Sequence, residues 1–341
     1  MKKKVELPLV EPMYKTYHNA IFSACIKENP SIRNYYLNEC FILECDRRFL
    51  FGFTTPTLNV LGCSAFDNPY LEKQWFYMHY IKGYINPIIR NLIDDGYYIY
   101  FSSIDDYYVE GKTWYKERHF NHNGAICGYN QEDKTYCMFA YDKNWIYQKF
   151  WTSQRGFNIG RKSAAKQGAN GAICAVKPKT GIVEFSVEKS CEKIREYLDS
   201  SLEKYPSNND GKVYGIAVQD YVAKYVEMLF QSKIPYERMD RRIFSLIWEQ
   251  KKVLHETIQR IEKVLLLDSD ISGKYKSIVN EADVLRMLYA SHRMKRRDSV
   301  LPIIQKKLLQ IKEKEEELLI QLLKKVEMEN ETLESYKKTY A

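Results

Sequence analysis

The chain has 341 residues, of which 45% are hydrophobic, and it carries a formal net charge of +8 at pH 7. This length allows one large domain or two smaller ones, and the apolar fraction is typical of a globular protein. No apolar run is long enough to span a bilayer, so we expect no membrane association. The basic start, Met1-Lys-Lys-Lys4, is not followed by an apolar signal core. We therefore expect a cytoplasmic protein.

Eight cysteines are scattered along the chain without paired CxxC spacing. This pattern favours reduced thiols over a disulfide framework, and it predicts no metal site. The positive net charge favours an acidic partner. No nucleic-acid-binding motif is recognisable, so we expect this partner to be an acidic protein and not a nucleic acid.

The first part of the chain predicts short elements of mixed type. In chain order, they are a helix over 18–26 ended by Pro30, a strand over 41–53, a helix over 69–93 kinked at Pro87, and a strand over 97–101.

A β-hairpin is predicted next, and it brings a histidine and an aspartate together. The mostly apolar run 122–129 is followed by a polar turn over 130–133 and by a second strand over 135–141. Antiparallel pairing would place His122, at the start of one strand, near Asp142, at the end of the other. A carboxylate there can hold an imidazole in one tautomer and leave its other nitrogen as a base. An ordinary hairpin with a surface histidine and a turn aspartate is the alternative.

Small polar residues follow, and then the pattern becomes helical. We expect 156–171 to be a mobile flap, because its glycines and alanines offer little surface for packing. The expected later elements are strands over 173–177 and 181–185, and helices over 187–202, 214–231, 235–267, 280–296 and 299–336. In the last helix, the residues that predict a buried face are Ile303, Leu308, Ile311, Leu318 and Leu322. The pattern as a whole predicts an α+β domain over 1–185 and an α-helical domain over 186–341.

A histidine–aspartate pair needs a nucleophile, and papain-like folds place a cysteine at the start of a helix, where the thiolate is stabilised. The first turn of the early helix ends at Ala20 and contains no cysteine. Cys25 lies about 140° from Ala20 around the helix axis, which favours burial in the core and makes Cys25 only a fallback nucleophile. The residues expected to border the substrate cleft are His18, Asn19, Tyr97, Tyr107 and Tyr108.

Several short segments occur in an order that resembles a known family. They are Tyr17-His18-Asn19, 50–53, 94–96 with 105–108, 119–122 with 128–129, and 140–142. Over about residues 10 to 150, the chain resembles the papain-like N-terminal domain of the butirosin biosynthesis acyltransferase family, and the closthioamide amide-forming enzyme is similar in type. The resemblance implies a papain-like, cysteine-protease-type first domain and a role in thiotemplated peptide biosynthesis.

The resemblance also implies a mechanism. A cysteine at position 20 would take an acyl or peptidyl group from the phosphopantetheine of an acidic carrier protein, with no further cofactor. His122, oriented by Asp142, would deprotonate this thiol and then activate a small amine. His119 is the fallback base. A homodimer through the long last helix is compatible with this interpretation.

Position 20 is occupied by Ala20, where the family pattern has a cysteine. The chain is therefore either an inactive form with cysteine replaced by alanine, or a relative that binds its ligand without catalysis. A papain-like protease or amidase would use the same residues and is the alternative activity.

Overall fold

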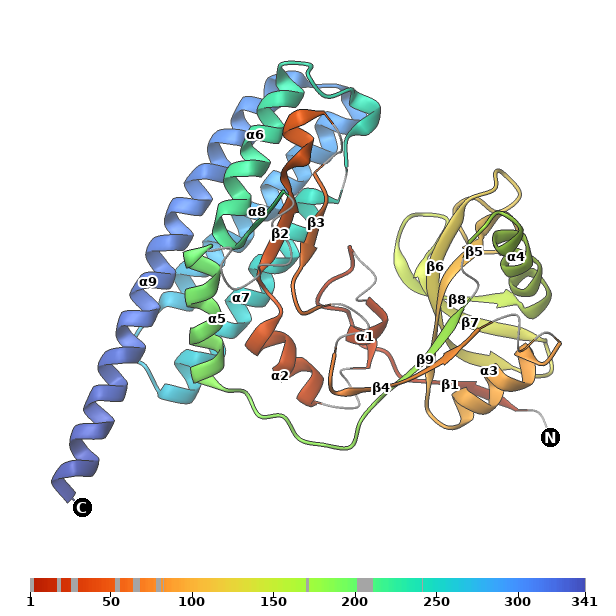
Figure 1. Cartoon of the computed structure of the whole chain (residues 1–341), viewed down its shortest axis with the longest axis horizontal. Helices are drawn as coiled ribbons and strands as arrows, with labels where there is room; N and C mark the ends of the chain where they lie inside the picture. Colours follow the sequence, from red (N-terminus) through yellow and green to blue (C-terminus); the bar gives the residue numbers. More distant parts are fainter. Residues whose placement is uncertain are drawn as a thin grey trace. The chain divides into compact units, whose positions relative to one another are not determined.

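A computed structural model describes residues 3–16, 20–25, 30–52, 56–63, 68–77, 81, 83–169, 172–200, 211–240 and 242–340. The chain divides into two compact units, which are both drawn in Figure 1. Unit 1 comprises Met1–Arg33 and Ser64–Ile182, and unit 2 comprises Asn34–Cys63 and Val183–Ala341. The predicted boundary after residue 185 is thus close to the second division of the chain. The segment 34–63, however, belongs to the helical unit and not to the first domain.

Unit 1 contains, within the described ranges, a seven-stranded sheet in the order β4-β9-β5-β6-β7-β8, with β1 paired to β6. Its strands are β1 (Lys4–Glu6), β4 (Leu71–Phe76), β5 (Tyr98–Asp105), β6 (Asn121–Asn130), β7 (Thr135–Tyr141), β8 (Tyr147–Ser153) and β9 (Ile173–Pro178). The predicted hairpin is confirmed, because β6 and β7 pair antiparallel with Ala125 opposite Phe139. The start of β6 therefore lies beside the end of β7.

Two helices of unit 1, α3 (Ile85–Asp94) and α4 (Gln154–Lys166), share one apolar core with the sheet. Within this core the rings of Phe101 on β5 and Phe157 on α4 meet edge to face, with their centroids 5.5 Å apart. Figure 1 shows α4 lying beside β5. The short helices of unit 1 are α1 (Ala20–Ala24) and the 3₁₀ turn η2 (Asp106–Tyr108).

The predicted flap over 156–171 is wrong, because most of this segment forms α4. Ser153 caps the helix by accepting a hydrogen bond from the backbone N–H of Gly156. A Cβ atom at Gly156 would lie 2.5 Å from the carbonyl oxygen of Tyr108, and one at Gly160 would lie 2.8 Å from the carbonyl oxygen of Asp105. The glycines therefore allow the helix to lie close against the end of β5. Residues 170–171 lie outside the described residues.

Prolines account for two further differences from the predicted elements. Pro30 begins α2 (Pro30–Glu39) where it was expected to end a helix, and Pro87 lies in the first turn of α3. Proline is well tolerated at such positions, because the first N–H groups of a helix have no partner within it. The expected helix over 69–93 is therefore the strand β4 followed by α3. The segment 181–185, expected to be a strand, has no regular structure.

Unit 2 contains the helices expected in the second half of the chain, with shifted ends. They are α5 (Val187–Asp199), α6 (Val218–Phe230), α7 (Ile243–Leu265), α8 (Ile271–Lys295) and α9 (Leu301–Tyr340), with 3₁₀ turns η1 (Arg47–Phe51), η4 (Gly215–Ala217), η5 (Tyr236–Arg238) and η6 (Asp298–Val300). Helices α6 and α8 pack on α9, as Figure 1 shows. In the described part of the chain, no helix is both long enough and apolar enough to cross a membrane.

The segment 34–63 joins unit 2 through α7 and through a small sheet. The side chains of Gln250 and Thr257 on α7 donate hydrogen bonds to the carbonyl oxygens of Phe41 and Leu37, each at 3.0 Å. The segment was expected to be a strand over 41–53, but only β2 (Leu43–Asp46) is extended before η1 begins.

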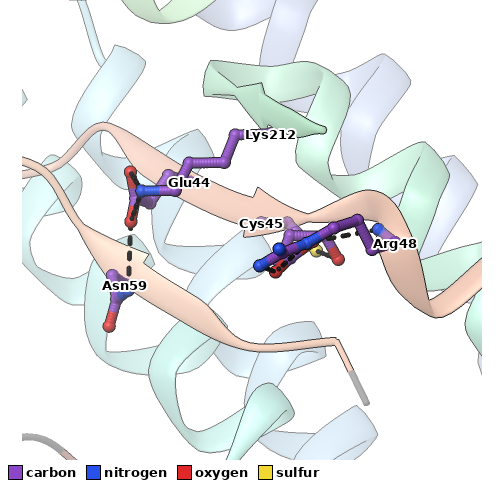
Figure 2. Close-up of polar contacts among 6 residues, drawn as sticks. Glu44, Cys45, Arg48, Asn59 and Lys212 are labelled. Atoms are coloured by element: carbon purple, nitrogen blue, oxygen red, sulfur yellow. Dashed lines mark hydrogen bonds and ion pairs between the residues drawn. The ribbon is translucent and has the colours of Figure 1, made fainter. Parts of the chain in front are cut away.

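The small sheet has the order β10-β2-β3, in which β10 is Lys212–Tyr214 and β3 is Leu58–Val60. Glu44 on β2 is almost fully buried and accepts hydrogen bonds from Asn59 at 3.0 Å and Lys212 at 3.1 Å. Figure 2 shows this carboxylate between the two donors. One buried carboxylate therefore connects all three strands.

The buried face of α9 is displaced by one residue from the predicted one at two positions. Ile303 is 48% exposed, and Ile304 is buried in its place. Leu318 is only half-buried, and Leu319 is buried in its place. The buried residues in the described part of the helix are Leu301, Ile304, Leu308, Ile311, Glu315, Leu319, Leu322, Leu323 and Val326. A charged residue thus lies within an apolar stripe.

Glu315 is fully buried and forms an ion pair with the equally buried Lys251 of α7, with 2.5 Å between Oε2 and Nζ. Its carboxylate also accepts hydrogen bonds from the side chains of Tyr197, Gln219 and Tyr275. Burying a charge is costly unless the charge is paired and hydrogen-bonded. The Glu315 carboxylate meets both conditions, and its contacts link α9 to four other helices, α5, α6, α7 and α8.

Lys251→Met should lower the free energy of unfolding of unit 2 by about 3–5 kcal/mol, because it leaves the Glu315 carboxylate buried without its cation. The double variant Lys251→Met/Glu315→Leu should recover much of this loss, because it removes both charges. Urea unfolding followed by circular dichroism measures both effects. If the double variant loses as much stability as Lys251→Met and Glu315→Leu lose in total, this account is contradicted.

Candidate functional site

The central group of the candidate site is the carboxylate of Asp105, at the end of β5. Asp105 is fully buried, and its Oδ2 lies 2.7 Å from Nδ1 of His119. Ser163 and Gln167, which follow each other on one face at the end of α4, donate to the same oxygen at 2.6 Å and 3.1 Å. The remaining donors are the backbone N–H groups of Tyr107 and Phe120, each 3.2 Å from Oδ1.

These contacts decide the charge of Asp105. Burial alone would raise the pKa of this carboxyl, but the hydrogen bonds from Ser163, His119 and two backbone N–H groups hold it below its ordinary value. Asp105 is therefore ionised at neutral pH. A carboxylate can only accept, so Nδ1 of His119 carries the proton of the shared hydrogen bond.

His119 is consequently oriented as a base. In the neutral ring, the proton on Nδ1 leaves the lone pair on Nε2. The His119 side chain is 54% exposed, so a substrate can approach it. The ring of Tyr107 stacks on the imidazole with 4.5 Å between centroids, which fixes the ring plane.

The next residue, Asp106, has entirely different surroundings. Its Oδ1 lies 3.4 Å from Nζ of Lys112, and both side chains are almost inaccessible to solvent. Burial raises the pKa of Asp106 to about 6, although Lys112 opposes this shift. Burial lowers the pKa of Lys112, and Asp106 opposes that shift in turn. Lys112 also lies 3.3 Å from Nδ1 of His122.

The predicted hydrogen bond between His122 and Asp142 is not formed. Asp142 accepts hydrogen bonds from Asn144 N at 2.8 Å, Ile146 N at 2.9 Å and Gln148 Nε2 at 2.6 Å, so its carboxylate closes the turn between β7 and β8. Burial raises the pKa of Asp142, but these donors outweigh burial and hold it below its ordinary value.

The strand ends nevertheless meet as the hairpin requires. The rings of Tyr141 and His122 are nearly parallel, with 6.0 Å between centroids. The hairpin prediction was therefore correct, and the error concerns only the direction of the Asp142 side chain. The fallback base, His119, lies within hydrogen-bonding distance of a carboxylate, that of Asp105, whereas the nearest carboxylate oxygen to His122 is 3.8 Å away on Asp106.

The predicted cleft residues fall into two groups. Tyr107 and Tyr108 both lie against the ring of His119. Tyr97 precedes β5 and is separated from Asp105 by the whole strand, about 25 Å at 3.3 Å per residue, so it does not border the pair of Asp105 and His119. Its hydroxyl instead contacts Glu72 and Gln74 of β4.

The nucleophile position is described only in part. His18 and Asn19 lie outside the described residues, and of Ala20 the structure describes only the backbone, at the first residue of α1. The predicted proximity of Ala20 to His122 therefore stays a prediction. Cys25 is buried, and its thiol donates to the carbonyl oxygen of Ile21 at 3.6 Å. All eight cysteines are buried.

Three residues of the site were missed from the sequence, namely Asp105, Ser163 and Gln167. The signal available in the sequence was the pair of adjacent aspartates, Asp105 and Asp106, which follow the strand predicted over 97–101. The contribution of α4 could not be predicted once 156–171 had been taken as a flap. Within the described ranges, no three metal-binding side chains gather at this site or elsewhere.

The adjacent aspartates should respond to pH in opposite ways. The lowered pKa of Asp105 means that its contribution to stability is complete above about pH 4 and is lost as the pH falls below that value. The raised pKa of Asp106, about 6, means that the fold loses stability as the pH rises from about 4 through 6.

The free energy of unfolding of the unchanged protein minus that of Asp105→Asn should therefore increase with pH in the acid range. The same difference taken for Asp106→Asn should decrease between pH 4 and 6. At pH 7, Asp105→Asn should cost about 2–3 kcal/mol, because several donors lose a charged acceptor. Urea unfolding from pH 3 to 7, followed by tryptophan fluorescence, measures both differences. Equal signs for the two variants would refute the assignment.

No family model matches the chain, and no curated protein matches it at a significant level.

Proposed function

We propose that unit 1 is the catalytic unit of an acyltransferase that moves an acyl group from a thioester to an amine, with His119 as its general base. The observation that carries this proposal is the 2.7 Å contact between Nδ1 of His119 and the buried carboxylate of Asp105. A carboxylate that fixes the tautomer of an exposed imidazole is the arrangement that activates nucleophiles in acyl transfer. The proposal thus assigns to His119 the role first expected of His122.

The choice of a thioester and an amine rests on the resemblance of the motifs to the papain-like acyltransferases. A net charge of +8 is consistent with an acidic carrier protein that presents the acyl group on phosphopantetheine. In this scheme the carrier protein and a small amine are the two partners, and no other cofactor takes part.

In the reaction, Nε2 of His119 takes a proton from the nucleophile as the nucleophile attacks the thioester carbonyl. The tetrahedral intermediate then collapses, the C–S bond breaks, and the proton passes from His119 to the departing thiolate. A cysteine at position 20 would make the reaction proceed in two steps through an acyl-enzyme, and an amine would attack in the second step. With Ala20 this covalent intermediate cannot form at that position.

A second candidate is a protein that binds an acyl thioester without transferring the acyl group. Two observations favour it: Ala20 occupies the expected nucleophile position, and each of the eight cysteines is buried. A papain-like protease or amidase is the third candidate, and it would attack an amide in place of a thioester and use water as the acceptor.

Ala20→Cys should create an acyl-enzyme on incubation with an acyl N-acetylcysteamine thioester, which carries the reactive end of the phosphopantetheine arm. Intact mass spectrometry should show the acyl mass on this variant and no adduct on the chain as it stands. In the Ala20→Cys background, His119→Asn should slow acylation about 10²- to 10⁴-fold, because the base is lost. Cys25→Ser is the matched control and should have no effect, since Cys25 is buried.

Each of the other outcomes points to a specific alternative. Binding of the thioester without an adduct on Ala20→Cys would favour the binding protein. An adduct that is hydrolysed but never transferred to added amines would favour the amidase. If the chain with Ala20 forms an adduct, and Cys25→Ser abolishes that adduct, the nucleophile is Cys25.

A further inference from the structure

Two buried thiols face each other across the β6–β7 hairpin. Sγ of Cys127 lies 3.6 Å from Sγ of Cys137. In the register of the hairpin, Gly128 lies opposite Cys137, and the pairing shifts by one residue just before it. Cys127 is therefore the additional residue of a β-bulge, and it shares Cys137 as its partner. A disulfide bond needs about 2.0 Å between its sulfur atoms, so rotation of the two side chains is enough to join this pair.

The hydrogen bond between the two thiols makes them unequal. Cys127 donates its S–H group toward Sγ of Cys137, and the carbonyl oxygen of Cys137 lies 3.5 Å from the same donor. This hydrogen bond lowers the pKa of Cys137, although burial opposes the shift. The same hydrogen bond and burial both raise the pKa of Cys127 well above its ordinary value. Cys137 therefore forms a thiolate, the reactive species, more readily than Cys127 does.

A surface ion pair covers the two thiols. Glu6 on β1 and Lys149 on β8 contact each other, and the charges of both act on both thiols. Lys149 lies opposite Phe139, two residues after Cys137, so its side chain is on the same face of the sheet as the Cys137 thiol. The side chains of Lys149 and Glu6 are 42% and 35% exposed, so solvent lies directly beyond them. Exposed ion pairs contribute little to stability, and this cover can therefore open while the hairpin stays folded.

We propose that Cys127 and Cys137 form a modification site for a small peroxide, which oxidises the two thiols to a disulfide across the β6–β7 hairpin. This inference is independent of the proposed acyl transfer. With hydrogen peroxide, the Cys137 thiolate attacks one oxygen, the O–O bond breaks, and the departing hydroxide takes up a proton to become water. The sulfenic acid left on Cys137 is then attacked by the sulfur of Cys127, the S–O bond breaks, and a second water leaves with the proton of the Cys127 thiol. Two thiols thus lose two electrons, and one peroxide gains them.

Hydrogen peroxide added to the folded protein should remove two of its eight free thiols. Intact mass spectrometry should show the loss of two hydrogen atoms, and peptide mapping should show a link between Cys127 and Cys137 that dithiothreitol reverses. Circular dichroism confirms that the protein stays folded during the reaction. Eight unchanged thiols, or a disulfide that joins other cysteines, would overturn the inference.

Single variants test the order of the two steps. Cys127→Ser should stop the reaction at the sulfenic acid of Cys137, which dimedone traps as a stable adduct. Cys137→Ser should slow the oxidation of Cys127 at least about tenfold, because the remaining thiol is buried and lacks an activating donor. A dimedone adduct on Cys127 of the unchanged protein, with none on Cys137 of the Cys127→Ser variant, would refute the assigned order.

The cover and the specificity of the site need separate controls. Glu6→Gln/Lys149→Met removes the ion pair and should speed disulfide formation about 3- to 10-fold, because the thiols are exposed more often. An unchanged rate would show that the ion pair is not the cover.

Cys63 in unit 2 provides the matched control. Its thiol is also buried and lies 3.8 Å from the carbonyl oxygen of Cys40, and burial raises its pKa well above the ordinary value. Cys63→Ser should leave the rate and yield of the disulfide unchanged. If Cys63 of the unchanged protein is oxidised as fast as Cys137, the hairpin has no special reactivity and the inference fails.

Discussion

The hydrogen bonds that converge on the Asp105 carboxylate connect three separate parts of unit 1. One donor group comes from the segment that leads into β6, a second from α4, and a third from the turn that follows β5. A buried carboxylate is tolerated only when its lone pairs are satisfied, so all of these donors must be in place together. The orientation of the His119 ring is therefore fixed by the same contacts that complete the fold around it.

Buried carboxylates organise both units in this way. Glu315 in unit 2 gathers donors from four helices, and Glu44 joins the three strands of the small sheet. Asp105 differs from these two in one respect, because one of its donors, His119, is substantially exposed. The Glu315 network keeps its members inside, whereas the Asp105 network extends to the surface through an imidazole, a group that can exchange a proton.

Local patterns in the sequence were sufficient for much of the architecture. The β6–β7 hairpin follows from two strand-like runs and a polar turn, and the helices of the second half follow from their periodicity. The direction of the Asp142 side chain did not follow, since it depends on competition between His122 and the N–H groups of its own turn. The turn holds the backbone N–H groups of Asn144 and Ile146 at fixed distances from Asp142, so the carboxylate accepts hydrogen bonds from them and not from His122.

Contacts distant in sequence explain the remaining errors. The dyad of Asp105 and His119 depends on α4, which contributes Ser163 and lies nearly 60 residues further along the chain. The segment 34–63 was assigned to the wrong domain because its partners, such as Gln250, come two hundred residues later. The pairing of His119 with Asp105 could not be deduced from hairpin patterns, because both histidines lie at or just before the start of β6 and only their partners distinguish them.

The close approach of α4 to β5 has a consequence for how this site can change. Gly160 allows the helix backbone to lie against the carbonyl oxygen of Asp105, one turn before Ser163. A single methyl group at position 160 would clash with this oxygen and displace the helix. The hydrogen bonds of Ser163 and Gln167 to the Asp105 carboxylate would then become longer. The electrostatic environment of Asp105 and His119 is thus adjustable from a position that contacts neither side chain's polar atoms. A substitution at Gly160 can change the surroundings of the His119 imidazole while Asp105, Ser163 and His119 themselves stay the same.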